Sequence, residues 1–304
     1  MRAPATWLLA LLTSTALAAP AAGPAAPPSS QDAPGLPPID AGTALLVVSP
    51  HPDDETLCCA GAIQRVLHAG GRVSIVWLTS GDAARIDLVL MGRSLFPSSA
   101  VAHELGVRRM AEARLAATRL GVSPAGQLFL GYPDGGLLEL PGGHRASPYV
   151  SHSTGASAVP YDAALYPRHP YTGESLERDF LHVLERVQPN LILAPTPLDA
   201  HPDHRAAGLL VQSLGTRLAA VAAVRYWIVH GGEGWPTPRD LLPGVPLTPA
   251  PLARSLAPAP FALEPAEEDG KLFALRAYES QLQVMAPFLL AFVRSNELYA
   301  LRAH

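Results

Sequence analysis

Lysine is almost absent from this sequence. Of its 22 basic residues only Lys271 is a lysine, and the arginines are scattered among 26 acidic residues, which leaves a formal net charge of −4. Proteins that bind nucleic acids or anionic membrane surfaces gather positive charge into patches or polybasic runs. The sequence therefore argues against a nucleic-acid partner and against a polybasic membrane surface.

Long hydrophobic runs are also missing. The longest one near the N-terminus, Trp7 to Ala18, is shorter than the roughly 20 residues that a membrane-spanning helix needs. Arg2 precedes this run and the small residues Ala16 and Ala18 end it, which is typical of a signal peptide. We expect residues 1–18 to be a signal peptide, cleaved after Ala18, and hence a secreted or periplasmic protein without a stable membrane anchor. An uncleaved anchor is the alternative.

Charged residues are few as well, at 16% of the chain against 48% hydrophobic residues. Disordered chains show the opposite balance, so the sequence predicts a folded protein, and 304 residues suit one enzyme-sized domain. We expect a flexible Ala/Pro-rich leader over residues 19–40 and a single domain over residues 41–304. Many of the 32 prolines cluster in two expected loop insertions, at about 137–173 and 236–265.

Only two cysteines are present, the adjacent Cys58 and Cys59. A bridge between neighbours falls outside the usual separation of bonded cysteines. We therefore expect two free, buried thiols on a core helix. A redox pair or a pair of soft metal ligands is the alternative interpretation.

Short apolar runs alternate with amphipathic segments along the chain. Residues 44–49 are apolar and β-branched and end at Pro50, a pattern typical of a strand buried on both faces. Strands that alternate with helices predict an α/β fold with a mainly parallel sheet. We expect strands at 44–49, 73–78, 127–130, 191–194 and 224–229, and helices at about 56–68, 107–121, 176–187, 207–218 and 267–301.

Two clusters of histidine and aspartate each follow a predicted buried strand. Residues 50–55 read PHPDDE, where a dinucleotide-binding enzyme needs a glycine-rich turn, so that class is excluded. Residues 199–204 read DAHPDH. Burying so many ionisable groups is unfavourable unless they pair or bind metal, and ligands of such sheets bind at the carboxyl ends of the strands. A turn histidine with an N-cap pair is the alternative for the first cluster.

A divalent metal ion would explain both clusters together. His51 and Asp54 from the first cluster and His204 from the second provide two imidazoles and one carboxylate. This is the pattern of a catalytic zinc site that keeps one position open. We expect Zn²⁺ as the cofactor, with another divalent metal as the alternative.

The remaining residues of the two clusters suit catalysis. Asp53, beside the ligand pair, is placed to act as a general base. His201, as an imidazolium, would stabilise an oxyanion and protonate a leaving amine. Asp203 would orient either histidine without binding the metal itself.

These motifs resemble those of the PIG-L/LmbE-like zinc-dependent deacetylases, which remove acetyl groups from N-acetylglucosamine-type sugars. The resemblance continues through residues 109–112, 120–122, 130–136 and 278–281, and covers about residues 43–300. It implies a Rossmann-like three-layer fold and the same roles for the residues of both clusters. Arg109 and Asp134 match positions that grip the sugar in that family.

The resemblance implies hydrolysis of an N-acetyl amide on a sugar. For an exported protein, we expect an amino-sugar or oligosaccharide substrate outside the cytoplasm. A zinc amidase or esterase that acts on a non-sugar acyl compound is one alternative, and a catalytically inactive secreted carbohydrate-binding protein is another. Four tyrosines in the first long loop would either stack on sugars or anchor the loop: Tyr149, Tyr161, Tyr166 and Tyr171.

Overall fold

The computed structural model describes residues 35–304. The expected signal peptide and residues 19–34 of the expected leader lie outside the described residues. Leu36 and Ile39, which we assigned to the leader, pack against the core, and the Gly35 carbonyl accepts a hydrogen bond from Arg225 Nε at 2.5 Å. The folded part therefore extends into the predicted leader. Within residues 35–304 no helix has both the length and the apolar character to cross a bilayer.

A parallel sheet forms the centre of the described fold. Its strands follow the order β3-β2-β1-β4-β5, and each neighbouring pair is parallel. All six residues of β1 are buried, as expected for an apolar run covered on both faces. The predicted strands are confirmed as β1 (Ala44–Ser49), β2 (Arg72–Thr79), β3 (Gln127–Tyr132), β4 (Leu191–Pro195) and β5 (Ala223–Trp227).

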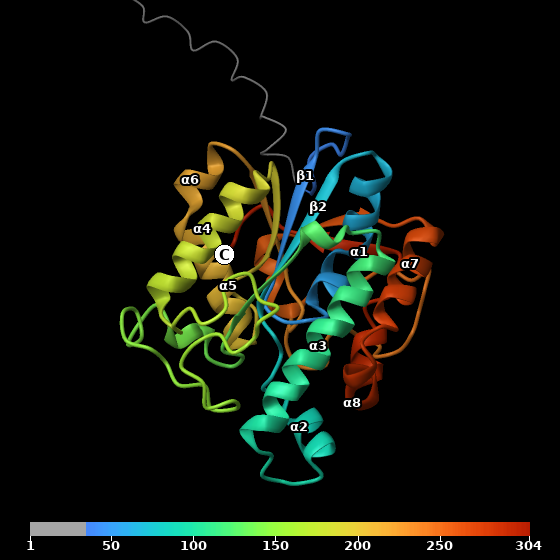
Figure 1. Ribbon diagram of the computed structural model, residues 1–304. Coiled ribbons are helices and arrows are strands. Elements are labelled where there is room, and N and C mark those ends of the chain that lie inside the picture. Colours follow the sequence, from blue (N-terminus) through green and yellow to red (C-terminus); the bar gives the residue numbers. More distant parts are fainter. Residues whose placement is uncertain (1–34) are drawn as a thin grey trace, which may run out of the picture.

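Helices cover both faces of this sheet. In Figure 1, α4 (Gly173–Val187), α5 (Pro202–Ser213) and α6 (Gly215–Ala219) lie on one side, and α1 (Asp54–His68), α3 (Ser99–Arg119) and α7 (Pro265–Leu275) lie on the other. The predicted three-layer α/β fold is confirmed. The other helical segments are α2 (Arg85–Gly92), α8 (Glu279–Leu290) and the 3-10 turns η2 (Pro124–Gly126), η3 (Leu137–Glu139) and η4 (Pro251–Leu256).

The order of the strands determines where a ligand can bind. The chain runs outward from β1 through β2 to β3, and then returns to place β4 on the other side of β1. The connection after β1 therefore runs towards the β3 edge of the sheet, and the connection after β4 runs towards the β5 edge. Such a switch point opens a crevice, which is the usual ligand site of open α/β sheets.

The C-terminal segment differs from the prediction of one helical tail over 267–301. Residues after α8 form β7 (Asn296–Tyr299), which pairs antiparallel with β6 (Ala259–Ala262) in the Pro-rich insertion. Pro287 and the non-helical Met285 (φ −139°) interrupt α8. Apolar spacing alone predicted a continuous helix, whereas the strand depends on pairing with a distant segment.

Helix α3 also begins earlier than the predicted residue 107. It begins at Ser99 because the Ser98 hydroxyl accepts a hydrogen bond from the Val101 N–H at 3.4 Å and caps the helix. Helix α2 was not predicted at all. It is short and partly exposed, so its sequence lacks a long apolar stripe.

The first long loop, residues 137–173, is anchored by its tyrosines. The Tyr161 hydroxyl donates to Asp82 Oδ2 at 2.5 Å, and the Tyr171 hydroxyl donates to the Gly131 carbonyl at 3.1 Å. Tyr149, Tyr161 and Tyr171 are all buried. The structure therefore favours loop anchoring over sugar stacking for these three side chains.

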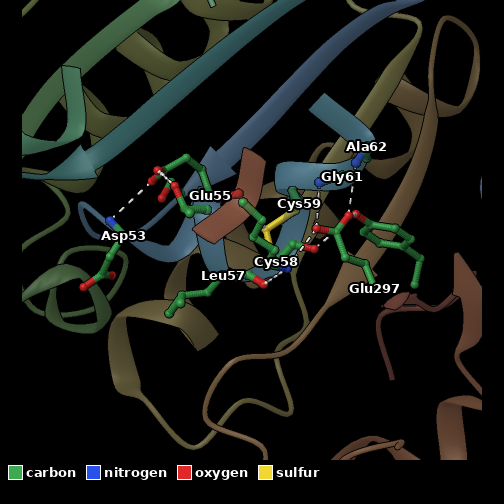
Figure 2. Close-up of a disulfide and its surroundings, with 12 residues drawn as sticks. Asp53, Glu55, Leu57, Cys58, Cys59, Gly61, Ala62 and Glu297 are labelled. Atoms are coloured by element: carbon green, nitrogen blue, oxygen red, sulfur yellow. Dashed lines mark hydrogen bonds and ion pairs between the residues drawn. A yellow bond between two sulfur atoms is a disulfide. The ribbon is translucent and has the colours of Figure 1, made fainter. Parts of the chain in front are cut away.

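The prediction of free cysteines is wrong. A disulfide joins Cys58 to Cys59 with an S–S distance of 1.97 Å (Figure 2). The prediction rested on the usual Cα separation of bonded cysteines, about 4.4–6.8 Å, and this bridge forms at a Cα separation of 3.8 Å. The other part of the prediction is confirmed, because both residues are buried on α1.

Candidate active site

The two predicted clusters meet at the switch point of the sheet. His51 lies in the turn between β1 and α1, and Asp54 is the first residue of α1. His204 lies in the first turn of α5, which follows β4. Because β1 and β4 are parallel neighbours, their carboxyl ends carry both clusters to one point of the fold.

Three potential ligand atoms form a tight triangle there. His51 Nδ1 lies 3.2 Å from His204 Nε2 and 3.3 Å from Asp54 Oδ2, and His204 Nε2 lies 3.1 Å from Asp54 Oδ2. Atoms bound to a tetrahedral zinc at about 2.0 Å are roughly 3.3 Å apart. The spacing and the chemistry of this donor set therefore fit one zinc ion.

Carboxylates behind the triangle hold both imidazoles in place. Asp203 Oδ2 lies 3.2 Å from His51 Nε2, and Asp134 Oδ1 lies 3.3 Å from the same nitrogen. Asp199 Oδ2 lies 3.1 Å from His204 Nδ1. Carboxylates in this position orient metal-binding histidines and raise their basicity.

The same carboxylates favour positive charge at the triangle. Burial alone would lower the pKa of His204, but Asp199 and Asp54 raise this pKa to about 9. Burial likewise opposes a charged His51, yet Asp134 and Asp203 raise its pKa well above the usual value. The site is therefore electrostatically suited to a cation.

Asp203 has a second structural function. Its carboxylate accepts hydrogen bonds from the backbone N–H groups of Gly135 at 2.7 Å and Leu137 at 3.0 Å. It therefore ties the start of the first long loop to His51. Asp203 thus contacts His51, one of the expected metal ligands, and lies outside the lining of the cavity described below.

Asp53 lies beside the triangle in an unusual backbone conformation. Its φ of 120° and ψ of −32° are sparsely populated for a residue with a side chain, and such strain costs about 1–3 kcal/mol. Asp53 occupies the N-cap position of α1 without a side-chain capping bond. Its backbone N–H instead contacts the buried Glu55 carboxylate at 3.3 Å (Figure 2). The Asp53 carboxylate therefore does not cap α1 and can contact other groups.

The protonation of Asp53 suits a general base near neutral pH. Burial raises the pKa of its carboxyl to about 8, the Arg109 guanidinium lowers it, and the nearby Asp54 carboxylate raises it. A base is most effective when its pKa lies near the working pH. A cation bound at the triangle would lower the pKa of Asp53 further.

Arg109 holds Asp53 and two backbone segments. Its Nη2 donates to Asp53 Oδ2 at 3.1 Å and to the Pro52 carbonyl at 2.7 Å, and its Nη1 donates to the Gly81 carbonyl at 3.0 Å. A Cβ at Gly81 would lie 2.2 Å from Arg109 Nη1, so glycine is needed for this approach. Arg109, the predicted sugar-binding residue, thus contacts Asp53 directly and also lines the cavity described below.

Asp134, the other predicted sugar-binding residue, reaches both the cavity and a ligand. One carboxylate oxygen faces His51, and the other accepts the Ala83 N–H at 2.8 Å. The neighbouring imidazole and guanidinium hold the pKa of Asp134 well below its usual value although burial would raise it. Asp134 is therefore an ionised acceptor at the edge of the site.

The surroundings of His201 favour a neutral imidazole over the imidazolium that we expected. It is the N-cap of α5, where its Nδ1 accepts a hydrogen bond from the Asp203 N–H at 3.2 Å. Burial, together with the imidazoles of His51 and His204, lowers the pKa of His201 to about 3. A protonated Nδ1 would lose the capping bond. The lowered pKa and the capping bond both favour the neutral imidazole with its proton on Nε2.

These residues line one cavity of about 230 Å³. Its lining contains polar side chains, which we call the polar wall, and apolar side chains, which we call the apolar wall. The polar lining is His51, Asp53, Arg109, Asp134, His201, His230 and Gln281, and the apolar lining is Leu57, Ala83, Ala84, Val229, Met285, Phe288 and Leu289. Every predicted site residue except Asp54, Asp203 and His204 therefore lines this cavity, and each of these three has a side-chain atom within 3.3 Å of the His51 ring.

Sequence reasoning assigned no function to two residues of this site, Asp199 and His230. Asp199 was part of the second cluster, and its distance of five residues from His204 gave no sign of their contact. His230 directly follows the predicted strand 224–229. The rule that selected His51 and His204, polar residues at the carboxyl end of a buried strand, would have selected His230 as well.

The family model PIG-L, described as GlcNAc-PI de-N-acetylase, matches residues 46–214. The chain belongs to this family. A 1D-myo-inositol 2-acetamido-2-deoxy-α-D-glucopyranoside deacetylase of Kribbella flavida is 27% identical over 197 residues, covering 64% of this chain and 59% of that protein. A diacetylchitobiose deacetylase of Thermococcus kodakarensis is 28% identical over 169 residues, covering 55% and 46%. The chain thus spans about half the length of these relatives.

Solved structures confirm the fold. A deacetylase triple mutant from the teicoplanin biosynthetic pathway aligns with a TM-score of 0.53 at 16% identity, covering 85% of this chain and 97% of that one. The 4-carboxy-2-hydroxymuconate hydratase GalB of Pseudomonas putida aligns with a TM-score of 0.50 at 19% identity, covering 81% and 82%. Because a hydratase shares this fold, the reaction has to be argued from the site.

Proposed function

We propose that this protein is a zinc-dependent hydrolase that removes the N-acetyl group from an N-acetylglucosamine-type amino sugar or oligosaccharide. The observation that carries the proposal is the triangle of His51 Nδ1, Asp54 Oδ2 and His204 Nε2, with sides of 3.1–3.3 Å, beside a buried carboxylate with a raised pKa. Membership of the PIG-L family and the names of both relatives support an N-deacetylase.

Two imidazoles and one carboxylate are the protein ligands of many catalytic zinc sites. Zinc bound there would act as a Lewis acid that polarises an acyl carbonyl and makes a water molecule more acidic. His51, Asp54 and His204 would hold the ion, and Asp203 and Asp199 would orient the two imidazoles. Another divalent metal is compatible with the same donors.

Asp53, Arg109 and His201 then have separate functions in the reaction. The Asp53 carboxylate takes a proton from the attacking water and passes it to the departing amine nitrogen, so that acetate and a free amine form. Arg109 keeps the carboxylate at the reacting centre through its 3.1 Å hydrogen bond. Neutral His201 donates a hydrogen bond from Nε2 to the oxyanion that develops on the acyl group.

The polar wall supports a sugar substrate. Ionised Asp134 is an acceptor for sugar hydroxyl groups at the edge of the cavity. The expected signal peptide supports export, and hence an amino-sugar substrate in the periplasm or outside the cell. Both the export and this substrate are parts of the proposal.

A second candidate is a zinc amidase or esterase that acts on a non-sugar acyl compound. The apolar wall favours it, because Met285 and Phe288 of α8 are only half-buried and line the cavity. The same metal site would serve either substrate.

Acetate release from the zinc-loaded protein tests the proposal. We expect release from N-acetylglucosamine or its oligomers, faster than from N-acetylated amino acids, and none from the His204→Ala variant. Faster release from the amino acids would favour the second candidate. Absence of release from all these compounds would reject the proposed deacetylase.

A further inference from the structure

His230 is a third imidazole at the cavity, beside the metal triangle. It follows β5, and its half-buried side chain lines the cavity. The ring stacks on Phe288, with centroids 5.7 Å apart and planes 15° apart, and meets His204 edge-on at 4.8 Å. Contacts on two sides therefore fix the plane of the His230 ring.

The backbone of His230 is fixed by the carboxylate that orients His204. Asp199 Oδ2 accepts the His230 N–H at 3.0 Å and lies 3.1 Å from His204 Nδ1. One oxygen atom thus sets the position of His230 relative to a metal ligand. This arrangement is expected of a residue whose position matters to the reaction.

The ring nitrogens of His230 are available to a ligand. Within residues 35–304 neither nitrogen has a hydrogen-bond partner. One of them lies within 4.8 Å of both a carboxylate oxygen of Asp54 and a ring nitrogen of His204. The space between these three side chains can hold one oxygen atom. This atom would lie near Asp54 and His204 and would accept a hydrogen bond of about 2.8 Å from His230.

We propose that His230 donates a hydrogen bond from a ring nitrogen to the acyl oxygen of the substrate, as a second donor beside His201. This inference rests on the proposed deacetylase function and adds a catalytic residue to it. A neutral imidazole carries one N–H. Two fixed donors stabilise a developing oxyanion better than one, because both are already oriented when its charge appears.

The test removes the N–H donor of His230 and keeps an aromatic ring at this position. His230→Phe retains the stacking on Phe288, and His230→Gln restores a side-chain donor. We expect His230→Phe to keep one zinc per chain and wild-type Tm while kcat falls about 10²-fold, and His230→Gln to recover part of that loss. His182→Phe, an exposed histidine on α4, is the matched control and should leave kcat unchanged.

Two results would overturn the role. Wild-type kcat in His230→Phe would make the residue a packing group. Loss of zinc in His230→Phe would make it a metal ligand. If His230→Phe does not fold, His230→Ala removes the same donor and should show the same loss of kcat with zinc retained.

Acetate binding separates this inference from the proposed function. Acetate is the product, and its carboxylate presents the same oxygen chemistry to His230. We expect titration of the Co²⁺-loaded protein with acetate, followed by visible absorption, to give a Kd about tenfold higher in His230→Phe than in the wild type. Equal values would refute the role of His230. Failure of the wild type to release acetate would refute only the deacetylase.

Discussion

Arg109 Nη2 donates a hydrogen bond of 3.1 Å to Asp53 Oδ2, which lies 56 residues earlier in the sequence. The same nitrogen donates to the carbonyl of Pro52 at 2.7 Å, so one guanidinium fixes both the backbone of the strained turn and its carboxylate. Arginine suits this position because its planar group donates in several directions at once. Arg109 therefore positions Asp53, the expected general base, and it also lines the cavity.

Arg109→Lys should therefore lower kcat with little change in KM. A lysine cannot reach the carboxylate and two carbonyls in the same geometry, and misplacing a reacting group by about 1 Å costs on the order of 10²-fold in rate. Steady-state kinetics of the zinc-loaded variant test this. Arg108→Lys, on the more exposed face of α3, is the control. A raised KM with unchanged kcat would instead support a sugar-binding role for Arg109.

Asp53→Asn and His204→Ala should separate catalysis from metal binding. Asp53→Asn removes the proton acceptor and leaves the three donor atoms in place, so zinc content should stay at one per chain while kcat falls about 10²–10⁴-fold. His204→Ala removes one corner of the triangle, and zinc affinity should fall with activity. Zinc analysis after dialysis gives the answer. Zinc loss in Asp53→Asn with retention in His204→Ala would reverse the two assignments.

The sequence predicted the sheet and the convergence of the two clusters for the same reason. Short apolar, β-branched runs such as residues 44–49 are typical of strands buried on both faces, and parallel neighbours carry the residues that follow them to one edge. The strand β7 was missed because its pairing with β6 depends on a segment far away in the sequence. The lowered pKa of His201 could not be predicted from a motif, because burial and the neighbouring imidazoles of His51, His204 and His230 cause it.

Asp199→Asn should weaken zinc binding although Asp199 is not a ligand. Asp199 Oδ2 faces His204 Nδ1 and two backbone N–H groups, and Oδ1 accepts the His201 N–H at 2.8 Å. All partners are donors, so the amide group of asparagine would face an N–H in either orientation. We expect the zinc Kd to rise about 10–100-fold, measured by competition with a chromophoric chelator. An unchanged Kd would show that His204 needs no such support, and the exposed Asp162→Asn serves as control.

Removing the metal should destabilise the folded protein. A ligand that binds only the folded state at about 1,000 times its Kd adds roughly 4 kcal/mol to the free energy of unfolding. We expect Tm to fall on adding a chelator and to return with zinc, followed by circular dichroism. His204→Ala should show no zinc-dependent change in Tm. Equal Tm values of the wild type with chelator and with zinc would argue against a metal site at the triangle.

The buried carboxyl of Asp82 should make stability depend on pH in a predictable direction. Burial raises the pKa of Asp82 from 3.8 to about 7, and the Asp134 carboxylate adds to the rise. Hydrogen bonds from Tyr161 and Ser153 oppose it without cancelling it. Between about pH 4 and pH 7 the folded protein therefore keeps a proton that the unfolded chain has lost.

The sign of the effect follows from proton linkage. Where the folded state binds more protons, the free energy of unfolding falls as pH rises, by up to about 1.4 kcal/mol per pH unit for one group. The contribution of Asp82 is therefore largest below about pH 4 and is lost as pH rises towards 7. Asp82→Asn cannot ionise and still offers hydrogen-bonding groups to Tyr161 and Ser153. In denaturant unfolding from pH 4.5 to 8, the variant should gain stability relative to the wild type as pH rises. Parallel curves for the two proteins would mean that Asp82 stays ionised in the folded state.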